Sequence, residues 1–273
     1  MIVPRPSRFW AILEKIVYPL FRRVDFRGKG RLRAVLPVRS EGTAIAGLPG
    51  GIRLELDLRE SLQRDFLFGL YDRYELSLVR RHLSAGGDFV DVGAHIGMYT
   101  VAAALALGGR GRVLAFEPNP AARAQLEKNL ALNGCDNVVV SGRAVADVVG
   151  AAFLHVPGTP DPSFSSLEAG RFAEGTPVPV ATTTLDREVD AVGLRPAVIK
   201  IDVEGSELRV LDGMERTLEA RPVLLVEVSA ESGAELELRL EGLGYRAFRV
   251  ARRRLAPGLA GGRGLFNVLF VPA

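Results

Sequence analysis

Short apolar runs alternate with helical segments from residue 88 towards the carboxyl end of the chain. Runs at 88–93, 112–118 and 137–142 predict buried strands, and apolar spacing predicts helices at 100–108 and 119–134. Strands separated by helices pair in parallel, so the pattern favours a sheet with helices on both faces. Further extended segments are predicted at 151–156, 177–184, 197–203 and 222–228, and further helices at 207–220 and 231–243.

The end of the chain departs from this alternation. Apolar runs at 245–250 and 265–272 are joined by an Arg- and Gly-rich loop without a helical pattern. Two strands joined in this way pair antiparallel. The fold class predicted is therefore α/β, with a doubly wound, mostly parallel sheet that ends in an antiparallel strand.

Residues 1–84 differ in pattern from residues 85–273, so we expect an N-terminal extension that packs on an α/β domain. Polar and apolar residues alternate at 52–58, after a turn at 47–51, as in a half-buried strand. The segment 72–84 has helical periodicity. The apolar face of that helix consists of Leu76, Val79 and Leu83.

The first residues of the chain are basic and partly apolar. Their apolar spacing predicts a short amphipathic helix, formed around Trp10, Leu13, Val17 and Leu20. We expect this helix to pack on the body of the protein. The alternative is a weak contact with a membrane surface, assisted by Arg5, Arg8, Arg22 and Arg23.

Composition excludes several classes of protein. The formal net charge of +3 over 273 residues is too small to imply nucleic-acid binding. The single cysteine, Cys135, excludes an intramolecular disulfide and a cysteine-based zinc site, and it favours the reducing cytoplasm. The sequence contains no uncharged apolar run of about 18 residues, so no transmembrane segment is expected.

A glycine-containing turn after the strand 88–93 is the strongest local sign of a ligand site. It has the sequence Asp91-Val-Gly93-Ala-His95-Ile-Gly97. Glycine lets a ligand approach the backbone, and the N-terminus of the next helix offers N–H groups to a carboxylate. Asp91 would face a cationic amino group. A tight strand-to-helix turn in any α/β protein is the alternative explanation.

Glu117 ends the next predicted strand, where an acid can accept hydrogen bonds from a ribose diol. Nicotinamide dehydrogenases and enzymes that bind S-adenosylmethionine share this arrangement. A dinucleotide loop requires G-x-G-x-x-G, but His95 replaces the middle glycine here. Asp91 also adds negative charge where a pyrophosphate would lie. The loop therefore favours a cationic amino-acid head.

Charged residues gather at the carboxyl end of the strand 197–203. The sequence there is Lys200-Ile-Asp202-Val-Glu204-Gly-Ser-Glu207. Open α/β sheets bind ligands at this end of their strands, and strand alternation predicts Lys200, Asp202 and Glu204 on one side. The alternative is an ion pair of Lys200 with Asp202 or Glu204 that only compensates buried charge.

These motifs together resemble those of FkbM-type methyltransferases. The resemblance is carried by FVDVGAHIGMYT, FEPNP, GRAVAD, the TLD at 184–186, KIDVEGSE and, upstream, FLFGLYDRYELSLVRRHL. It extends from about residue 50 to residue 271. It implies S-adenosyl-L-methionine as cofactor, the Rossmann-like sheet of class I methyltransferases, and O-methylation of a hydroxyl on a sugar or secondary metabolite.

One motif departs from the wider class. Many class I enzymes carry an acid after the third strand for the adenine amino group, whereas Gly142-Arg143-Ala144 stands here. Adenine contacts are expected from Ala144, from Asp147 or from stacking of Arg143. The full set of residues expected to bind the cofactor is Asp91, Gly93, Ala94, His95, Gly97, Thr100, Glu117, Pro118, Asn119, Arg143, Ala144 and Asp202.

Methyl transfer requires the protein to supply position, desolvation and a sink for the hydroxyl proton. Asp202 and Glu204 have a second possible role as ligands of a divalent metal, but no compelling third ligand is evident in the sequence, so no metal is expected. The candidate catalytic residues are Asp202, Glu204, Glu207, Lys200 and His155.

The expected methyl acceptor is a hydroxylated small molecule, such as a sugar, a glycolipid or a polyketide-like compound. Ser163, Ser165 and Ser166 lie in a loop that either covers the site or is simply solvated. Two other functions stay open. One is a nicotinamide-dependent oxidoreductase, which the loop disfavours, and the other is a cofactor-binding scaffold that has lost catalysis.

Overall fold

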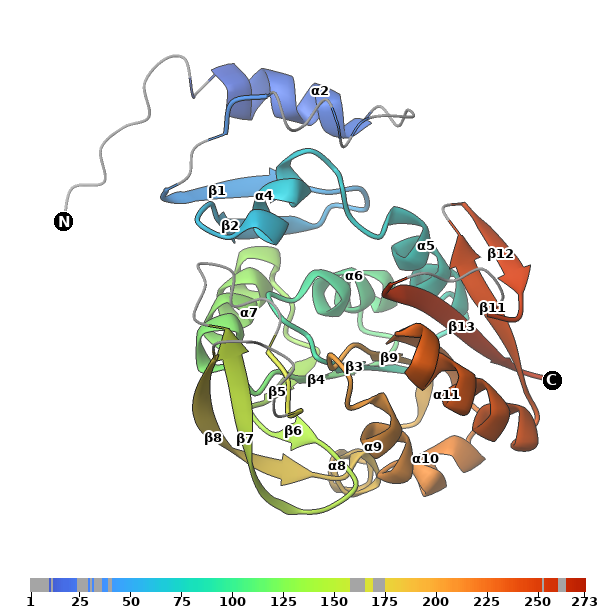
Figure 1. The fold of residues 1–273 in the computed structure, drawn as a ribbon. Coiled ribbons are helices and arrows are strands. Elements are labelled where there is room, and N and C mark those ends of the chain that lie inside the picture. The colour runs from blue at the N-terminus through green and yellow to red at the C-terminus, as the bar shows by residue number, and fades with distance from the viewer. Residues whose placement is uncertain are drawn as a thin grey trace.

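A sheet with helices on both faces lies at the centre of the molecule (Figure 1). The computed structural model describes residues 10, 12–23, 29, 31, 36–38, 41–157, 165–168, 175–251, 253–259 and 264–273. Within these residues the strands of the central sheet are β3 (Asp88–Val92), β4 (Val113–Phe116), β5 (Val138–Ser141), β9 (Pro196–Ile201), β10 (Val223–Val228), β11 (Tyr245–Ala251), β12 (Arg254–Pro257) and β13 (Phe266–Pro272).

The order of these strands is β12-β11-β13-β10-β9-β3-β4-β5. All neighbours from β10 to β5 pair in parallel, whereas β13 pairs antiparallel with both β10 and β11. The predicted doubly wound sheet with an antiparallel terminal strand is therefore confirmed. Strand β12 lies in the Arg- and Gly-rich loop, where no strand was predicted, and pairs with β11.

Successive side chains on each strand enter two separate cores, one on each face of the sheet. Phe89 and Val113 pack with helices α5, α6 and α7, whereas their neighbours Val90 and Leu114 pack with α8 to α11 on the other face. The strands are apolar throughout because both faces are covered. The helices are α5 (Arg73–His82), α6 (Met98–Leu107), α7 (Pro120–Asn133), α8 (Leu185–Val192), α9 (Glu207–Asp212), α10 (Glu215–Glu219) and α11 (Ala230–Gly242).

The ends of α7 carry the predicted capping signals. The side chain of Asn119 accepts a hydrogen bond from Ala121 N at 3.0 Å, Pro120 begins the helix, and Gly134 ends it with a φ of 63°. These groups satisfy backbone donors and acceptors that a helix end otherwise leaves unpaired. The sequence-based bounds of this helix are therefore accurate.

The single helix predicted over 207–220 is wrong. It is divided into α9 and α10 at Gly213. A Cβ at this glycine would lie 2.2 Å from the carbonyl oxygen of Ala146, so the backbone of a distant loop occupies the space of a side chain. This tertiary contact requires a glycine at the interruption, and apolar periodicity does not reveal it. Helix α8 was also not predicted.

Two further strands near the N-terminus, β1 (Thr43–Gly47) and β2 (Arg53–Asp57), form the predicted hairpin. Amide side chains of α7 cover the free edge of β2. Asn129 Oδ1 accepts from Glu55 N at 2.7 Å, and Asn133 Oδ1 accepts from Arg53 N at 2.8 Å. An uncovered strand edge exposes unpaired backbone groups. These amides therefore take the place of a third strand and attach the hairpin to the sheet domain.

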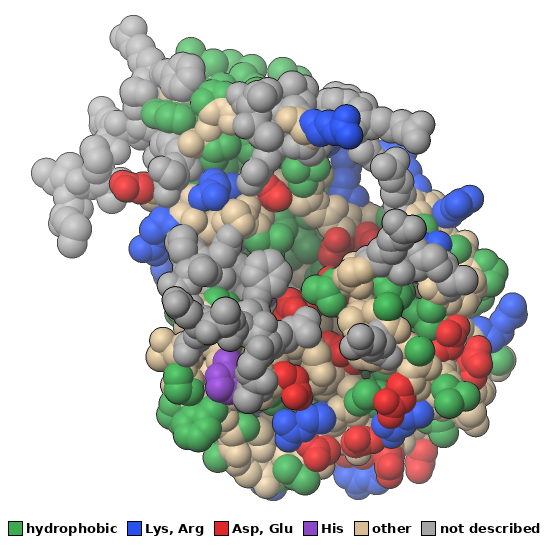
Figure 2. All heavy atoms as spheres, viewed as in Figure 1, with side chains coloured by type: hydrophobic (Ala, Val, Ile, Leu, Met, Phe, Trp, Pro, Cys, Tyr) green, Lys and Arg blue, Asp and Glu red, His purple; other side chains and the backbone are tan. Residues whose placement is uncertain are grey.

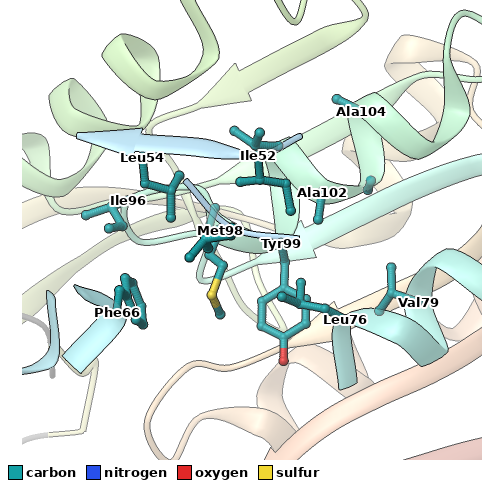
Figure 3. Packing of buried hydrophobic residues seen from close by; sticks show 14 of the residues in the cluster. Ile52, Leu54, Phe66, Leu76, Val79, Ile96, Met98, Tyr99, Ala102 and Ala104 are labelled. Atoms are coloured by element: carbon teal, nitrogen blue, oxygen red, sulfur yellow. The ribbon is translucent and has the colours of Figure 1, made fainter. Parts of the chain in front are cut away.

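The hairpin shares its apolar core with the helices beneath it. Ile52 and Leu54 gather in one cluster with Leu76 of α5 and Tyr99 of α6 (Figure 3). Helix α4 (Ser61–Leu67), for which the sequence carried no prediction, adds Phe66 to the same cluster. The N-terminal segment thus packs on the sheet domain as expected.

The predicted N-terminal helix is present as η1 (Leu13–Val17) and α2 (Tyr18–Arg23), lying over the hairpin and α4 (Figure 1). Leu13 and Tyr18 are buried, but Leu20, expected on the packed face, is exposed. Arg5 and Arg8 lie outside the described residues. Among the helices that are described, none is long and apolar enough to cross a bilayer.

A small second sheet follows β5. It consists of β6 (Ala144–Val145), β7 (Gly150–Pro157) and β8 (Gly175–Thr183), in the order β6-β8-β7. Strands β7 and β8 pair antiparallel, which confirms the two extended segments predicted here.

Asn129 joins the hairpin to the loop after β3, because its Nδ2 also donates to Ile96 O at 2.8 Å. Asn129→Ala should lower the free energy of unfolding by about 2–3 kcal/mol, since it leaves two buried backbone groups without partners. Chemical denaturation measures this loss. Glu127→Ala, at an exposed position of the same helix, is the matched control, and equal stability of the two variants would contradict the prediction.

Candidate active site

The candidate site lies between the carboxyl ends of β3 and β9. From β3 the sheet grows through β4 to β5, whereas on the other side of β3 it continues through β9 to β10. Open α/β sheets bind ligands at such a reversal of strand order. A pocket opens between the loops that follow these two strands, and acidic side chains gather around the hollow at the centre of Figure 2.

Segments far apart in the sequence line this pocket. The lining contains ten of the predicted site residues: Gly93, Ala94, His95, Glu117, Pro118, Asn119, Ala144, Lys200, Asp202 and Glu204. It also contains residues that the sequence did not single out, among them Leu62, Phe66, Leu70, Tyr71, Asp72 and Glu227.

Gly93 and Gly97 are required by the packing of the chain itself. Their φ values are 85° and 89°. A Cβ at Gly93 would lie 1.8 Å from the carbonyl oxygen of Asp202, and a Cβ at Gly97 would lie 2.4 Å from Cδ1 of Leu126. This packing accounts for both glycines without a ligand, although Gly93 also lines the pocket. Gly97 does not line the pocket.

Hydrogen bonds within the protein also occupy the N–H groups of this loop. Gly93 N and Ala94 N donate to Phe116 O at 3.1 and 2.9 Å, and His95 N donates to Glu117 Oε2 at 2.7 Å. His95 has a φ of 49°, which is uncommon for a residue with a side chain. The loop is therefore clamped to the end of β4, and these three N–H groups are already satisfied within the protein.

Glu117 is buried at the edge of the pocket, and backbone donors hold both of its carboxylate oxygens. Oε1 accepts from Asn119 N at 2.8 Å, and Oε2 accepts from His95 N. Burial raises the pKa of Glu117 to about 7, although the two backbone hydrogen bonds oppose this shift. Each oxygen keeps a second lone pair, so Glu117 can still accept a hydrogen bond from a ligand.

Asp91 lies behind the pocket wall, not on its surface. Its Oδ2 accepts from Thr100 Oγ1 at 2.6 Å, and its Oδ1 has no hydrogen-bond partner among the described residues. Asp91 pairs across the sheet with Lys200. Burial raises the pKa of Asp91, and Lys200 opposes the shift. The expected direct contacts of Asp91 and Thr100 with a ligand are corrected, because both side chains are fully buried.

Lys200 is buried and paired. Its Nζ lies 2.8 Å from Asp202 Oδ2 and 4.7 Å from the centre of the Tyr99 ring. Burial alone would lower the pKa of Lys200, but Asp202 and Asp91 outweigh burial and raise it. The ammonium therefore stays charged. The ion pair considered from the sequence exists, and it lies in the wall of the pocket.

Asp202, Glu204 and Glu227 form a group in which one carboxylate oxygen of each residue lies within 4.8 Å of the other two. Strand β9 ends at Ile201, so alternation along a strand is not the reason that Asp202 and Glu204 lie together. They lie in the turn that follows, where Glu204 has a φ of 53°. The turn, not the strand, brings these acids together.

Glu227 is the member of this group that sequence reasoning missed. Burial, and after it Asp202, raise the pKa of Glu227 to about 8. The available signal was a single acid near the end of the apolar run 222–228. Because Val226 pairs with Ile201, the following residue comes beside Asp202. The group thus contains the third possible metal ligand that was not expected.

Asp72 brings a further acid to the pocket from the N-terminal segment. It precedes α5, and its Oδ2 accepts from the hydroxyl of Tyr99 at 2.9 Å. Burial raises the pKa of Asp72. An acid before a helix is ordinarily a cap, so no local signal distinguishes this one.

Two candidate catalytic residues lie off the pocket. Side chains alternate along β7, so Leu154 lines the pocket and His155 does not. The backbone of His155 pairs with Ser166. Glu207 is buried at the start of α9, where its Oε1 accepts from Gly205 N at 2.7 Å. Neither residue lines the pocket, and a catalytic role of His155 or Glu207 stays a prediction.

Two candidate adenine contacts are engaged elsewhere. Arg143 forms an ion pair of 3.0 Å with Glu188, and Asp147 forms one of 2.8 Å with Arg209. Neither Arg143 nor Asp147 lines the pocket. Of the expected adenine contacts, Ala144 alone is part of the lining.

The serine loop reaches the pocket. Ser163 lies outside the described residues. Ser165 lines the pocket and accepts from Asn119 Nδ2 at 3.1 Å, and Ser166 Oγ donates to Glu204 O at 2.7 Å. These contacts favour a segment that covers the site over a loop that is simply solvated.

Charge decides which ligand fits this pocket. Among the described residues that line the pocket, Lys200 carries a positive charge and five side chains are acidic. Opposite charge is attracted and like charge is repelled in such a cleft, so the site suits a ligand with cationic groups and a ribose, and it disfavours a pyrophosphate. S-Adenosyl-L-methionine has these properties. The acids are Asp72, Glu117, Asp202, Glu204 and Glu227.

A sheet of this topology is the fold of class I methyltransferases, and an acidic pocket at the reversal of strand order suits their cationic cofactor. Residues 91–247 match the family described as "Methyltransferase FkbM domain". Because this range is more than half of the chain, the protein belongs to that family. Membership of this family implies S-adenosyl-L-methionine as the cofactor, and the nicotinamide alternative is set aside.

Similar proteins include a hexuronic acid methyltransferase, AglP, of Haloferax volcanii. It is 30% identical over 148 residues, which are 51% of this chain and 55% of that protein. The chain thus spans about half the length of this relative. Among solved structures, precorrin-6y C5,15-methyltransferase of Geobacter metallireducens matches with a TM-score of 0.45 and 14% identity, covering 72% of this chain and 87% of that one. TYW2 of M. jannaschii, in complex with AdoMet, also matches with a TM-score of 0.45. It is 16% identical, and the match covers 87% of this chain and 90% of that one.

Glu117 makes stability depend on pH. Its pKa is 4.5 ordinarily and about 7 in the folded protein. Between these values the folded state holds more protons than the unfolded state, so stability falls as pH rises. The melting temperature of the ligand-free protein should therefore decline from about pH 5 to pH 7, and Glu117→Gln should make this decline shallower.

Asp147→Asn serves as the control for this measurement. Arg209 lowers the pKa of Asp147, so this acid titrates below the window and its replacement should keep the wild-type slope. Equal slopes in wild type and Glu117→Gln would contradict the prediction.

Proposed function

We propose that the protein transfers the methyl group to a hydroxyl oxygen of a sugar or of a sugar-like secondary metabolite. The observation that carries this proposal is the group of three carboxylates, Asp202, Glu204 and Glu227, at the wall of the pocket. A hydroxyl needs a proton acceptor when its oxygen is methylated. The similarity to a hexuronic acid methyltransferase supports a sugar acceptor.

When bound, S-adenosyl-L-methionine supplies an electrophilic methyl group on a sulfonium. We assign the ribose to Glu117, whose oxygens keep acceptor capacity at the end of β4. We assign the adenine to the wall that contains Ala144 and Val145. Asp91 contributes through Lys200, since it balances the buried ammonium from the neighbouring strand.

The acceptor is assigned to the side of the pocket formed by the N-terminal segment. Phe66, Leu70 and Tyr71 provide apolar surface there, and Asp72 and Glu227 provide acceptors for hydroxyl groups. A mixture of apolar walls and a few polar groups is typical of small-molecule sites. The acceptor hydroxyl is thus held beside the carboxylates.

The proton of the acceptor hydroxyl passes to the carboxylate group. Acids this close titrate together, so their pKa values belong to the group and not to single residues. Lys200, at 2.8 Å from Asp202, compensates part of their negative charge. Asp202, Glu204 and Glu227 are therefore all candidates for the base, and the ion pair positions the first of them.

A divalent cation is the second way in which this group can act. Three carboxylates offer the oxygen ligands that Mg²⁺ and Ca²⁺ prefer. The ammonium of Lys200 already supplies positive charge beside Asp202, so we favour direct proton acceptance. Loss of activity with a chelator and its return with Mg²⁺ would instead assign the metal role.

Methyl acceptors can be identified by incubating the protein with ¹³C-methyl-labelled cofactor and a panel of sugars, uronic acids and hydroxylated metabolites. We expect one class to gain a single methyl group by mass spectrometry, with a carbon shift typical of a methyl ether. A methyl group on nitrogen or carbon would contradict the proposal. Cofactor binding without transfer to any acceptor would favour the scaffold alternative.

Asp202→Asn, Glu204→Gln and Glu227→Gln each replace one acid of the group without changing its size. We expect the variant that removes the base to lose roughly 10²- to 10⁴-fold in single-turnover rate. For Glu204→Gln and Glu227→Gln the melting temperature and the affinity for S-adenosylhomocysteine should stay close to wild type, because the ribose is assigned to Glu117. Asp202→Asn also removes the partner of Lys200 and should lower the melting temperature.

Asp147→Asn, which alters an acid away from the pocket, is the control and should keep its rate. Full activity in all three folded variants would remove the carboxylates from the mechanism. A loss of rate that only follows a loss of folded protein would show that the acids serve the ion pair with Lys200.

A further inference from the structure

Exposed apolar side chains form a stripe along the N-terminal helix, which comprises η1 and α2. Ile12 and Ile16 are each 54% exposed, and Leu20 is 56% exposed. Residues four apart on a helix lie above one another on the same face. Three large apolar side chains at this spacing therefore form one continuous strip, here called the apolar stripe. The green atoms at the top of Figure 2 lie in this part of the molecule.

The opposite face of the helix is firmly attached to the body of the protein. Tyr18 is 1% exposed, its ring centre lies 5.1 Å from that of Phe68, and its hydroxyl donates to Pro37 O at 2.6 Å. Phe21 packs on the same ring at 5.7 Å. The helix has thus already buried one apolar face, and the apolar stripe is a second one that nothing in the described chain covers.

Charge is distributed unequally between this segment and the rest of the chain. Residues 1–33 contain nine Lys and Arg and two Asp and Glu, a net charge of +7. The whole chain carries +3, so residues 34–273 carry −4. The basic surplus of the protein therefore comes entirely from the segment that contains the apolar stripe.

We propose that the N-terminal helix docks the protein on the surface of an anionic membrane. The apolar stripe enters the boundary between headgroups and acyl chains, and the basic residues of the segment 1–33, apart from the buried Lys29, bind anionic headgroups. The acidic remainder of the chain is repelled by the same surface, which orients the molecule. A second copy of this chain is disfavoured as the occupant, because it would bring two strongly positive segments together.

Docking in this way has a consequence for the pocket. Helix α2 packs on α4, whose residues Leu62 and Phe66 line the pocket. The membrane-bound helix and the proposed acceptor wall are therefore neighbours. The membrane contact itself does not depend on which acceptor is methylated, so it can be tested without any activity measurement.

Vesicle flotation of the full chain tests the proposal directly. We expect the protein to float with vesicles of phosphatidylcholine and phosphatidylserine but not with phosphatidylcholine alone. Binding should weaken as salt is raised, because salt screens exposed charges. No binding to the phosphatidylserine vesicles at low salt would overturn the proposal, as would equal binding to both vesicle types.

The combined variant Ile12→Ser, Ile16→Ser and Leu20→Ser removes the stripe and leaves the charge unchanged. We expect its partition coefficient on anionic vesicles to fall by roughly 100-fold, because three apolar side chains no longer leave water. The matched control replaces three apolar residues on the body of the protein that are also more than half exposed, Phe153→Ser, Leu238→Ser and Leu243→Ser. This control should bind like wild type.

Two results would contradict the assignment of the stripe. One is an equal loss of binding in both triple variants while each keeps its melting temperature. The other comes from sedimentation without lipid. A dimer of the wild-type protein that the stripe variant dissociates would assign this face to a second copy of the chain.

Discussion

The whole site depends on the close contact between the backbone at Gly93 and the backbone at Asp202. The carbonyl oxygen of Asp202 occupies the position that a Cβ of Gly93 would take, and Asp202 N donates to Val92 O at 2.9 Å. Strands β3 and β9 are neighbours in the sheet, and this contact continues their association past the strand ends. It holds the loop after β3 against the turn that carries the carboxylates.

The buried ammonium of Lys200, whose charge is compensated by neighbouring acids, is the second feature on which the site depends. The ammonium of Lys200 is almost fully removed from water, which is costly unless partners are present. Asp91 faces it from β3, Asp202 pairs with it, and the ring of Tyr99 lies above it. The charges at the pocket wall are thus held in place by contacts that run through three neighbouring elements.

The N-terminal segment completes the pocket and is itself held by polar side chains. Asn129 and Asn133 bind the edge of β2, and Asn129 also binds the carbonyl of Ile96, in the loop after β3. Helix α7 therefore fixes both the hairpin and the loop after β3. Phe66 and Asp72 then reach the pocket from the chain that follows the hairpin.

The local pattern of apolar and polar residues was sufficient to predict most of the fold. Apolar runs and helical spacing predicted the parallel sheet, the terminal antiparallel pair and the bounds of α7, since these depend on periodicity and on capping groups close in sequence. The motifs around Gly93, Glu117 and Lys200 also predicted where the pocket lies, because the carboxyl ends of parallel strands meet at one edge of the sheet.

Tertiary structure alone decided which residues share the pocket. Glu227 comes beside Asp202 through the pairing of β9 with β10, and Asp72 comes from the N-terminal segment. Neither position has a local sequence signal, because each depends on contacts between distant parts of the chain. For the same reason His155, on the other face of β7, lies off the pocket. The sequence by itself determined the class of protein and the edge of the sheet at which the pocket opens, whereas packing between distant segments determined the walls of the pocket.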